Sequence, residues 1–403
     1  MREGWQRLKY IVDINARDLD EDTDPTCEFR YADIGSVGRG ALLAEPEPMA
    51  FADAPSRARR LVRSGDTIVS TVRTYLGAVW PVKGDTDDMV VSTGFAVLTP
   101  RRGLDARYLG WIAQSDLVID EIVARSVGVS YPAINGLEIG DVAVPVPPVP
   151  AQRRIADYLD AETARIDRII DSMAQRADLL ELRKRAAVST ALRSVATATV
   201  TVRRVVDLVT SGPRGWSDLV VDSGSSLFLR IANVPRDSIS LRLDDVAFIE
   251  PPSAAEADRC RVRPGDVLTT ITAAIGQVGV VPAGLGEAYV SQHLALVRPE
   301  PSRVVPEWLA LALWTDDAQR QLDAARYGGT KQQLALDDIR DIRIPWAPLP
   351  TQRTTVGRVL PSLAALTEAS TQTRRAVALL QERRQALITA AVTGQIEIPG
   401  VAA

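Results

Sequence analysis

The sequence has few of the residues that enzymes use for chemistry or that secreted proteins use as cross-links. Two cysteines and one histidine occur in 403 residues. Cys27 and Cys260 fall in different halves of the chain and form neither a disulfide framework nor a metal cluster. His293 lies in the apolar run Val290–Leu296, where an ordinary sheet position is a simpler interpretation than a general base.

Membrane segments and familiar catalytic motifs are also missing from the sequence. No apolar run approaches the roughly 18 residues of a membrane span, and the polar start Met1–Lys9 lacks a signal peptide's core. No phosphate-binding loop, dinucleotide turn, metalloprotease helix or paired-cysteine motif is present, and neither is the N-P-P-Y/F motif of base-methylating enzymes. We therefore expect a cytoplasmic protein that is not an enzyme.

One acidic segment superficially resembles a calcium-binding loop. It runs from Asp18 to Asp24, but Thr23 stands where the turn glycine belongs and Phe29 where the bidentate glutamate belongs. A solvated acidic loop is the better interpretation. We expect no metal and no cofactor to be bound directly by this chain.

Charge gives no general indication of a nucleic-acid partner. The net charge is −4, and the apolar and charged fractions of 46% and 24% are typical of a soluble globular protein. Only four of the 47 basic residues are lysines. Basic residues exceed acidic ones in 151–200 (9 against 7) and in 351–403 (6 against 3). A DNA-binding interpretation must therefore depend on local arginine clusters.

The most regular part of the sequence predicts a long coiled-coil helix. A proline-rich start, Pro145–Pro150, precedes about forty residues without Pro or Gly, and proline favours an extended start. A seven-residue apolar repeat comprises Leu159, Ile166, Met173, Leu180 and Ala187, and the stripe is widened by Ile155, Ile169, Ile170 and Ala177. Such a repeat keeps one face of the helix against a partner helix.

The partner helix is in the same chain. The prolines with Gln152 and Arg153 recur two hundred residues later as Pro345, Pro348, Pro350, Gln352 and Arg353. The stripe then recurs as Val359, Leu366, Thr373, Leu380 and Leu387. A helix from Gln152 to Ser194 would be about 65 Å long at about 1.5 Å per residue. Antiparallel packing would place the intervening domains at opposite ends without a long return connection.

The segments before the two helices are repeats of one strand-rich domain. Ser64–Ile68 matches Pro264–Leu268, and Asp141–Pro145 matches Asp341–Pro345. Short β-branched runs predict strands, and one helix is expected from Ala106 to about Val123. We predict domains at 1–150 and 201–350, helices at 151–200 and 351–394, and a tail at 395–403 that returns to the first domain.

Loop residues of both domains are candidates for contacting DNA. Arginine and lysine bind phosphates, whereas polar and aromatic side chains read base edges. The candidates in the first domain are Arg57, Arg59, Arg60, Arg63, Arg73, Tyr75, Ser130 and Tyr131. Those in the second are Arg214, Trp216, Arg259, Arg261, Arg263, Thr330, Lys331 and Gln332. The alternative interpretation of the arginines is a solvated surface beside Asp66 and Asp266.

With this repeat in view, the chain resembles the DNA-specificity subunit of type I restriction-modification enzymes over essentially its whole length. The matching segments are Gly265–Leu268, Ile275–Gly279, Gly329–Gln332, Ile344–Arg353 and Ala391–Gly394. The first repeat departs at Leu76–Val79 and Ser130–Pro132, and the second departs at Ser211–Trp216, where the family usually has a Gly-Gly-Thr-Pro turn. These departures leave the residues that contact bases open.

The resemblance implies an α+β fold in which two pseudo-symmetric, strand-rich target-recognition domains are separated by an antiparallel pair of long coiled-coil helices. Each domain would recognise half of a bipartite double-stranded DNA site, and the helices would set the spacer. Two methyltransferase subunits that bind S-adenosylmethionine would dock, followed by restriction subunits that use ATP and Mg. The alternatives are a coiled-coil adaptor without DNA specificity and a self-sufficient nuclease or methyltransferase.

Overall fold

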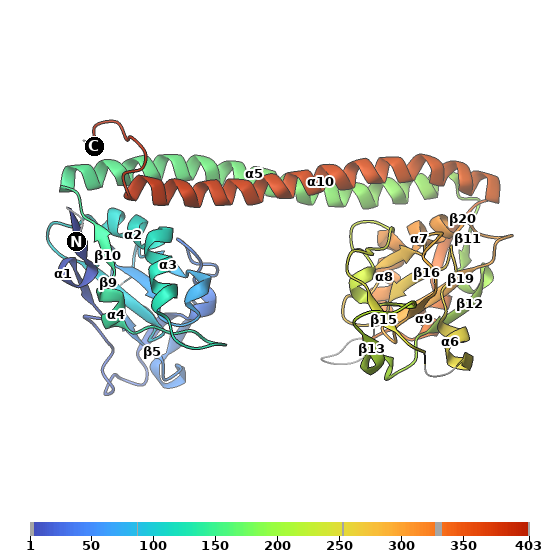
Figure 1. The fold of residues 1–403 in the computed structure, drawn as a ribbon, viewed down its shortest axis with the longest axis horizontal. Helices are drawn as coiled ribbons and strands as arrows, with labels where there is room; N and C mark the ends of the chain where they lie inside the picture. Colours follow the sequence, from blue (N-terminus) through green and yellow to red (C-terminus); the bar gives the residue numbers. More distant parts are fainter. Residues whose placement is uncertain (1–3, 87, 252–253, 327–332, 402–403) are drawn as a thin grey trace. The chain divides into compact units, whose positions relative to one another are not determined.

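The computed structural model describes residues 4–86, 88–251, 254–326 and 333–401 (Figure 1). It divides into two compact units, Met1–Ser172 with Ala376–Ala403, and Met173–Arg375. Each unit combines one globular part with a stretch of each of the two long helices, α5 (Val149–Val195) and α10 (Leu349–Val392). No helix among the described residues is long and apolar enough to cross a membrane.

The globular part of the first unit consists of short strands followed by a helical segment. Its strands are β1 (Trp5–Arg7), β2 (Val12–Ile14), β3 (Glu28–Ala32), β4 (Pro48–Ala50), β5 (Ala58–Leu61), β6 (Thr67–Ser70), β7 (Val79–Pro81), β8 (Met89–Ser92), β9 (Phe95–Pro100) and β10 (Ala143–Pro145). Its helices are α1 (Leu8–Ile11), α2 (Ala106–Gln114), α3 (Asp116–Arg125) and α4 (Gly136–Gly140).

The globular part of the second unit has the same sequence of elements with local changes. Its strands are β11 (Ala198–Thr201), β12 (Val206–Ser211), β13 (Val220–Val221), β14 (Leu227–Leu229), β15 (Ala247–Ile249), β16 (Val267–Thr270), β17 (Val278–Val280), β18 (Ala288–Val290), β19 (Leu294–Pro299) and β20 (Arg343–Trp346). Its helices are α6 (Ala254–Cys260), α7 (Pro306–Trp314), α8 (Asp316–Ala325) and α9 (Leu336–Asp341).

One four-stranded sheet has the same topology in the two units, and the other differs at its edges, where, among the described residues, β5 is present only in the first unit and β13 only in the second. The antiparallel order β2-β9-β6-β7 of the first unit corresponds to β12-β19-β16-β17 of the second. In the other sheet, β3 pairs parallel with β8 and antiparallel with β4, as β14 pairs parallel with β18 and antiparallel with β15. The units differ at β5, where the second unit has α6 and only an isolated bridge between Arg261 and Tyr289. The predicted mixed fold with two related strand-rich parts is confirmed.

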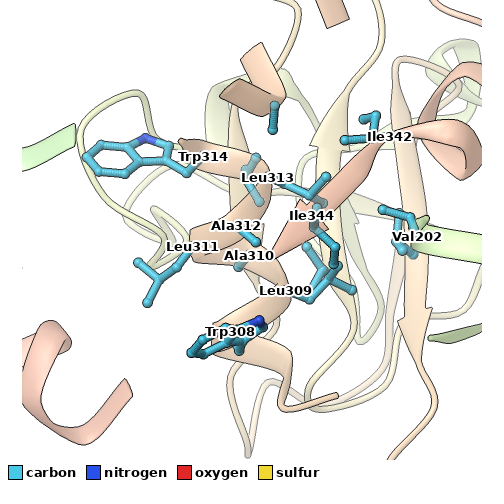
Figure 2. Packing of buried hydrophobic residues seen from close by; sticks show 14 of the residues in the cluster. Val202, Trp308, Leu309, Ala310, Leu311, Ala312, Leu313, Trp314, Ile342 and Ile344 are labelled. Carbon is cyan, nitrogen blue, oxygen red and sulfur yellow. The ribbon is translucent and has the colours of Figure 1, made fainter. Parts of the chain in front are cut away.

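Each globular part has its own hydrophobic core. This core includes the helix that follows β9 in the first unit (α2) and β19 in the second (α7). Every residue from Trp308 to Trp314 of α7 is at most 1% exposed, and Figure 2 shows this run packed near Ile342, Ile344 and Val202. The indole Nε1 of Trp308 donates a hydrogen bond to the carbonyl of Pro345 at 2.9 Å. The hydroxyl of Tyr108 donates to the carbonyl of Pro145, also at 2.9 Å. An identical contact therefore joins α2 or α7 to the proline-rich segment in each unit.

The expected single helix from Ala106 to about Val123 is wrong, because the chain forms two helices there. Ser115 separates α2 from α3 with φ −68° and ψ 150°, an extended conformation, and its hydroxyl donates to the Ile112 carbonyl at 2.5 Å. Thr315 separates α7 from α8 in the same way. Serine and threonine side chains compete for backbone groups in this manner, so apolar spacing alone did not reveal the break.

The long helices pack antiparallel to one another within each unit. In the first unit Arg384 Nε donates to Asp167 at 2.7 Å, and in the second Ser370 donates to Glu181 at 2.7 Å. The predicted stripe is correct through Leu159, Ile166 and Ala177 but wrong at Ile169 and Ala187, which are exposed, while Val188 and Leu192 are buried. The period of a straight helix is 3.6 residues, so a strict seven-residue repeat loses the buried face after several turns.

The C-terminal end of α10 and the following tail pack against the globular part of the first unit. After α10 ends at Val392, Gly394 adopts φ +72°, and Gln395 N–H donates to the Ala390 carbonyl at 2.8 Å. This is the left-handed helix ending that glycine favours. Ile398 is buried in the core of this unit and Ile396 packs against it, which holds the tail on the globular part.

Buried glutamines hold the start of each long helix on its globular part. Gln152 Oε1 accepts from Asp105 N–H at 2.8 Å, and its Nε2 donates to the carbonyls of Gly103 and Pro147. Gln352 makes the equivalent three bonds, to Val305 N–H at 2.8 Å and to the carbonyls of Arg303 and Ala347. The repeated Pro-rich motif with its glutamine is therefore the attachment point of each helix.

Replacing Gln352 by alanine should lower stability by about 2 kcal/mol, because it leaves the Val305 N–H and the Ala347 carbonyl without their partner. The Arg303 carbonyl keeps the hydrogen bond from the Trp346 indole. Urea denaturation followed by tryptophan fluorescence measures the loss. Arg353→Ala is the matched control, since Arg353 is exposed and makes no ion pair with any described residue; it should change stability by less than about 0.5 kcal/mol. Equal effects of the two variants would contradict this assignment.

Candidate nucleic-acid interface

A turn with a buried carboxylate precedes the central strand of each unit and positions the nearby arginines. Gly65 and Gly265 adopt φ +95° and +86°, which brings Asp66 and Asp266 into the interior. Asp266 accepts from Arg263 N–H at 2.7 Å and pairs with Arg298 at 2.8 Å. Asp66 and Asp266 are therefore hydrogen-bonded and paired inside the domain. They do not neutralise the exposed arginine side chains of the two clusters, Arg57–Arg63 and Arg259–Arg263.

The equivalent turn of the first unit has the same construction with a different arginine. Asp66 accepts from Arg63 N–H at 2.8 Å and from the Thr99 hydroxyl at 2.7 Å, and it forms an ion pair with Arg17. Arg17 comes from the N-terminal side of the domain, whereas Arg298 lies on β19. The duplicated turn is therefore preserved although the source of its cation has changed.

The four predicted arginines of the first cluster have different environments. Arg60 forms an ion pair with Asp18 at 2.7 Å, and the guanidinium of Arg59 lies 5.0 Å from the ring centre of Phe51. Arg57 and Arg63 are exposed, and their side chains make no ion pair with any residue that the structure describes. These two side chains are the ones in this cluster that remain available to an anionic partner.

The second cluster divides in the same way. Arg261 pairs with Glu287 at 3.0 Å and donates to the Tyr289 hydroxyl at 3.2 Å. Hydrogen bonds from Tyr289 and Ser226, with the nearby charge of Arg261, hold the pKa of Glu287 below its ordinary value. Arg259 and Arg263 are exposed and, within the described part of the chain, have no ion-pair partner.

A loop and a neighbouring segment form an exposed aromatic patch on the first unit. Arg73 lies 4.9 Å from the ring centre of Tyr131, and an isolated bridge between Val72 and Ala133 joins the two segments. Tyr131 is 65% exposed and Tyr75 is 58% exposed. Ser130 is exposed between Tyr131 and the fully exposed Val129. A guanidinium over the ring of Tyr131, with the exposed ring of Tyr75 two residues along the chain, is suited to contacting phosphates and bases.

Backbone strain marks the same position in both repeats. Arg73 has φ +50° and Ala273, two hundred residues later, has φ +55°. Non-glycine residues rarely adopt positive φ, and such positions persist only where the surrounding structure enforces them. The sequence offered no signal for this strain, since neither position is a glycine. The sequence prediction considered only polar and aromatic side chains, so it did not include the exposed apolar residues Leu76, Val127 and Val129 beside the patch.

The structure places Trp216 in the core and not on the surface. It is 2% exposed, and its ring meets Tyr289 edge-on with centroids 5.8 Å apart. The neighbouring Arg214 is exposed. Trp216 is therefore a core residue of the second unit and is not available to contact a ligand. Thr330, Lys331 and Gln332 lie outside the described residues.

His293 and Cys260 have ordinary environments for a sheet histidine and a buried thiol. His293 Nδ1 is hydrogen-bonded to the Thr272 hydroxyl at 2.8 Å. Burial raises the pKa of the Cys260 thiol to about 11, so it is protonated at neutral pH. Among the described residues no group of three or more His, Cys, Asp or Glu side chains could hold a metal ion, and this includes the acidic loop at 18–24.

Comparisons with known proteins give a consistent result. The specificity subunit of the type I restriction enzyme EcoBI from Escherichia coli is 22% identical over 306 residues, which cover 69% of this chain and 63% of that protein. The specificity subunit of HindI from Haemophilus influenzae is 26% identical over 110 residues, 27% of this chain and 24% of that protein. The match therefore spans less than two thirds of the length of either relative. No family model matches the chain.

The fold has a close counterpart among solved structures. A chain from a structure describing the assembly and conformational transition of a type I restriction-modification system superposes with a TM-score of 0.76 at 24% identity. It covers 98% of this chain, and 99% of that chain is matched. Two duplicated strand-rich parts with an antiparallel helix pair thus define a modular, two-domain architecture. The chain is homologous to the specificity subunits of type I restriction enzymes.

Substitutions at the two strained loop positions, one in each unit, test whether the positive φ costs stability. Ala273→Gly should raise stability by about 0.5–1 kcal/mol, because glycine removes the cost of positive φ and no large side chain is lost. Arg73→Val should lower stability by about 1–2 kcal/mol, since a β-branched residue fits positive φ poorly. Urea denaturation compares each variant with the parent chain. A stabilising effect of Arg73→Val would mean that the loop relaxes out of this conformation.

Proposed function

We propose that the chain is the sequence-specific DNA recognition subunit of a type I restriction-modification complex and has no catalytic role itself. The observation that carries the proposal is the duplication of one scaffold with different exposed loops. The sheets, the aspartate turn and the glutamine attachment recur, whereas the residues at 73–75 and 273–275 and around β5 and α6 differ. Two related scaffolds with unlike surfaces are suited to two unlike half-sites.

Recognition by each domain combines phosphate and base contacts. Arg57 and Arg63 in the first domain, and Arg259 and Arg263 in the second, are exposed without ion-pair partners in the described structure, which suits binding to phosphates. Arg73, Tyr75, Ser130 and Tyr131 form the exposed surface that is suited to base edges. Arg214, Lys331, Thr330 and Gln332 are candidates for the corresponding role in the second domain.

The partners follow from the relatives named as specificity subunits of restriction enzymes. We infer a bipartite double-stranded DNA site, two methyltransferase subunits that carry S-adenosylmethionine, and restriction subunits that use ATP and Mg. The helix pair would set the spacer between the half-sites. Action on DNA inside the cell places the protein in the cytoplasm. An adaptor without DNA specificity is less favoured, because it gives no reason for unpaired arginines and exposed tyrosines on duplicated domains.

Exchange of one domain tests the proposal as a whole. Residues 1–150 are replaced by the matching domain of a related specificity subunit, and the methylated motif is determined by single-molecule sequencing of a host that expresses the complete complex. One half of the motif should change and the other half should remain. An unchanged motif, or a change in both halves, would contradict independent recognition by the two domains. A host lacking the gene is the control.

Salt dependence tests the phosphate contacts. Arg63→Ala and Arg263→Ala should each reduce the magnitude of the slope of log K against log salt by about one, with little change in base preference. Arg60→Ala is the matched control, because Arg60 is already paired with Asp18 and should alter the slope less. Binding is measured with the motif found by methylome sequencing. A change of preferred bases at constant slope would assign the arginine to base recognition instead.

A further inference from the structure

A buried lysine lies in the interface between the two long helices of the second unit. Lys184 is 0% exposed, although it is in the interior of α5 and is one of only four lysines in the chain. An ammonium group removed from water is strongly destabilising unless it is paired and hydrogen-bonded. Its position therefore requires a specific set of partners.

These partners come from three elements of the unit. Lys184 Nζ lies 2.7 Å from Glu181 Oε2, 3.1 Å from the Asp237 carbonyl and 3.4 Å from the Thr367 hydroxyl on α10. The other oxygen of Glu181 accepts from the Ser370 hydroxyl at 2.7 Å, also on α10. We refer to Glu181, Lys184, Thr367 and Ser370 as the polar layer. Each of its two residues on α5 is bonded to one of its two residues on α10.

A related pair occupies the matching position of the first unit. Arg384 lies two hundred residues after Lys184, and Asp167 lies two hundred residues before Thr367. Arg384 Nε donates to Asp167 Oδ1 at 2.7 Å. In an antiparallel helix pair, residues that face one another have numbers that add to a constant total. The total is the same for three pairs: Lys184 with Thr367, Glu181 with Ser370, and Asp167 with Arg384. All three are consequently made by one antiparallel alignment of the helices.

Apolar contacts alone discriminate poorly between this alignment and one displaced by a heptad. The polar side chains discriminate strongly. A displacement of seven residues would place Lys184 opposite Leu360 or Arg374, and Asp167 opposite Val377 or Ala391. The buried ammonium would then face an apolar side chain or a like charge. A buried polar residue in a coiled coil specifies register for this reason, at some cost in stability.

We propose that the polar layer and the Arg384–Asp167 pair fix the register of the two long helices. The apolar stripe supplies the stability of the helix pair, whereas these residues select which alignment is populated. If the chain is the specificity subunit proposed above, Lys184 and Arg384 determine the spacer length without touching DNA. They are then positioning residues for recognition of a bipartite site.

The test measures register directly, in the full chain and without DNA. Cys27→Ser and Cys260→Ala remove the native thiols, and spin labels are attached at cysteines replacing the exposed Ala186 and Gln372. The parent chain should give one label-to-label distance. Lys184→Met with Arg384→Met should give additional populations whose axial separation differs by about 10 Å, the rise of seven helical residues. Its thermal midpoint should be lower, because Glu181 and Asp167 lose their cationic partners.

Arg183→Met with Arg383→Met is the matched control, because it removes the same charge from the adjacent, exposed positions. The control should keep the single parent distance. If the Lys184 and Arg384 double variant also keeps only that distance, the proposal is overturned. Should that variant not fold, Thr367→Val with Ser370→Ala and Asp167→Ala is measured instead. It removes the partners of the polar layer on α10 and the partner of Arg384, and it leaves Lys184 paired with Glu181. A single parent distance in that variant overturns the proposal equally.

Binding to DNA separates this proposal from the function on which its consequence depends. A complex containing the register-shifted variant should accept more than one spacer length between the half-sites. Additional label distances with an unchanged single spacer would support the register assignment and contradict the role of the helices in spacing. Absence of any sequence-specific binding by the parent complex would contradict the proposed function while leaving the distance measurement valid.

Discussion

The structure depends on two long helices that are each too polar to be stable alone. The buried face of α5 is narrow and most of its other positions are exposed to solvent. An isolated helix gains little from intrinsic propensity, so burial of this face against α10 and the globular part is what stabilises it. Because both helices arise from the duplicated segment, each supplies the apolar face that the other requires.

Duplication also explains how the helices are joined to their globular parts. Gln152 and Gln352 each satisfy one N–H and two carbonyls at the point where sheet, loop and helix meet. Tyr108 and Trp308 differ in size but donate the same hydrogen bond to the following proline-rich segment. The contacts that orient each helix on its domain are therefore conserved within the molecule, although many of the surrounding side chains have changed.

Much of this architecture could be predicted because it follows from spacing. A repeat of two hundred residues is visible in a single sequence, and the Pro-rich motif with its glutamine marks both helix starts. The break at Ser115, the exposure of Ala187 and the burial of Trp216 could not be predicted in this way. The break at Ser115 depends on a hydroxyl that competes for a backbone carbonyl. The exposure of Ala187 depends on the small difference between 3.5 and 3.6 residues per turn. The burial of Trp216 depends on tertiary packing against Tyr289.

The candidate interface was predictable in composition but not in geometry. Charge patterns identify arginine clusters, yet only the structure distinguishes Arg60 and Arg261, which are paired within the chain, from Arg63 and Arg263, which are not. The loop positions of Arg73 and Ala273 share a left-handed backbone although their side chains have nothing in common. A scaffold that fixes loop conformation independently of side-chain identity can present new residues to a ligand without refolding. This separation of backbone shape from surface chemistry is what a protein requires if its two domains are to recognise different sequences with one fold.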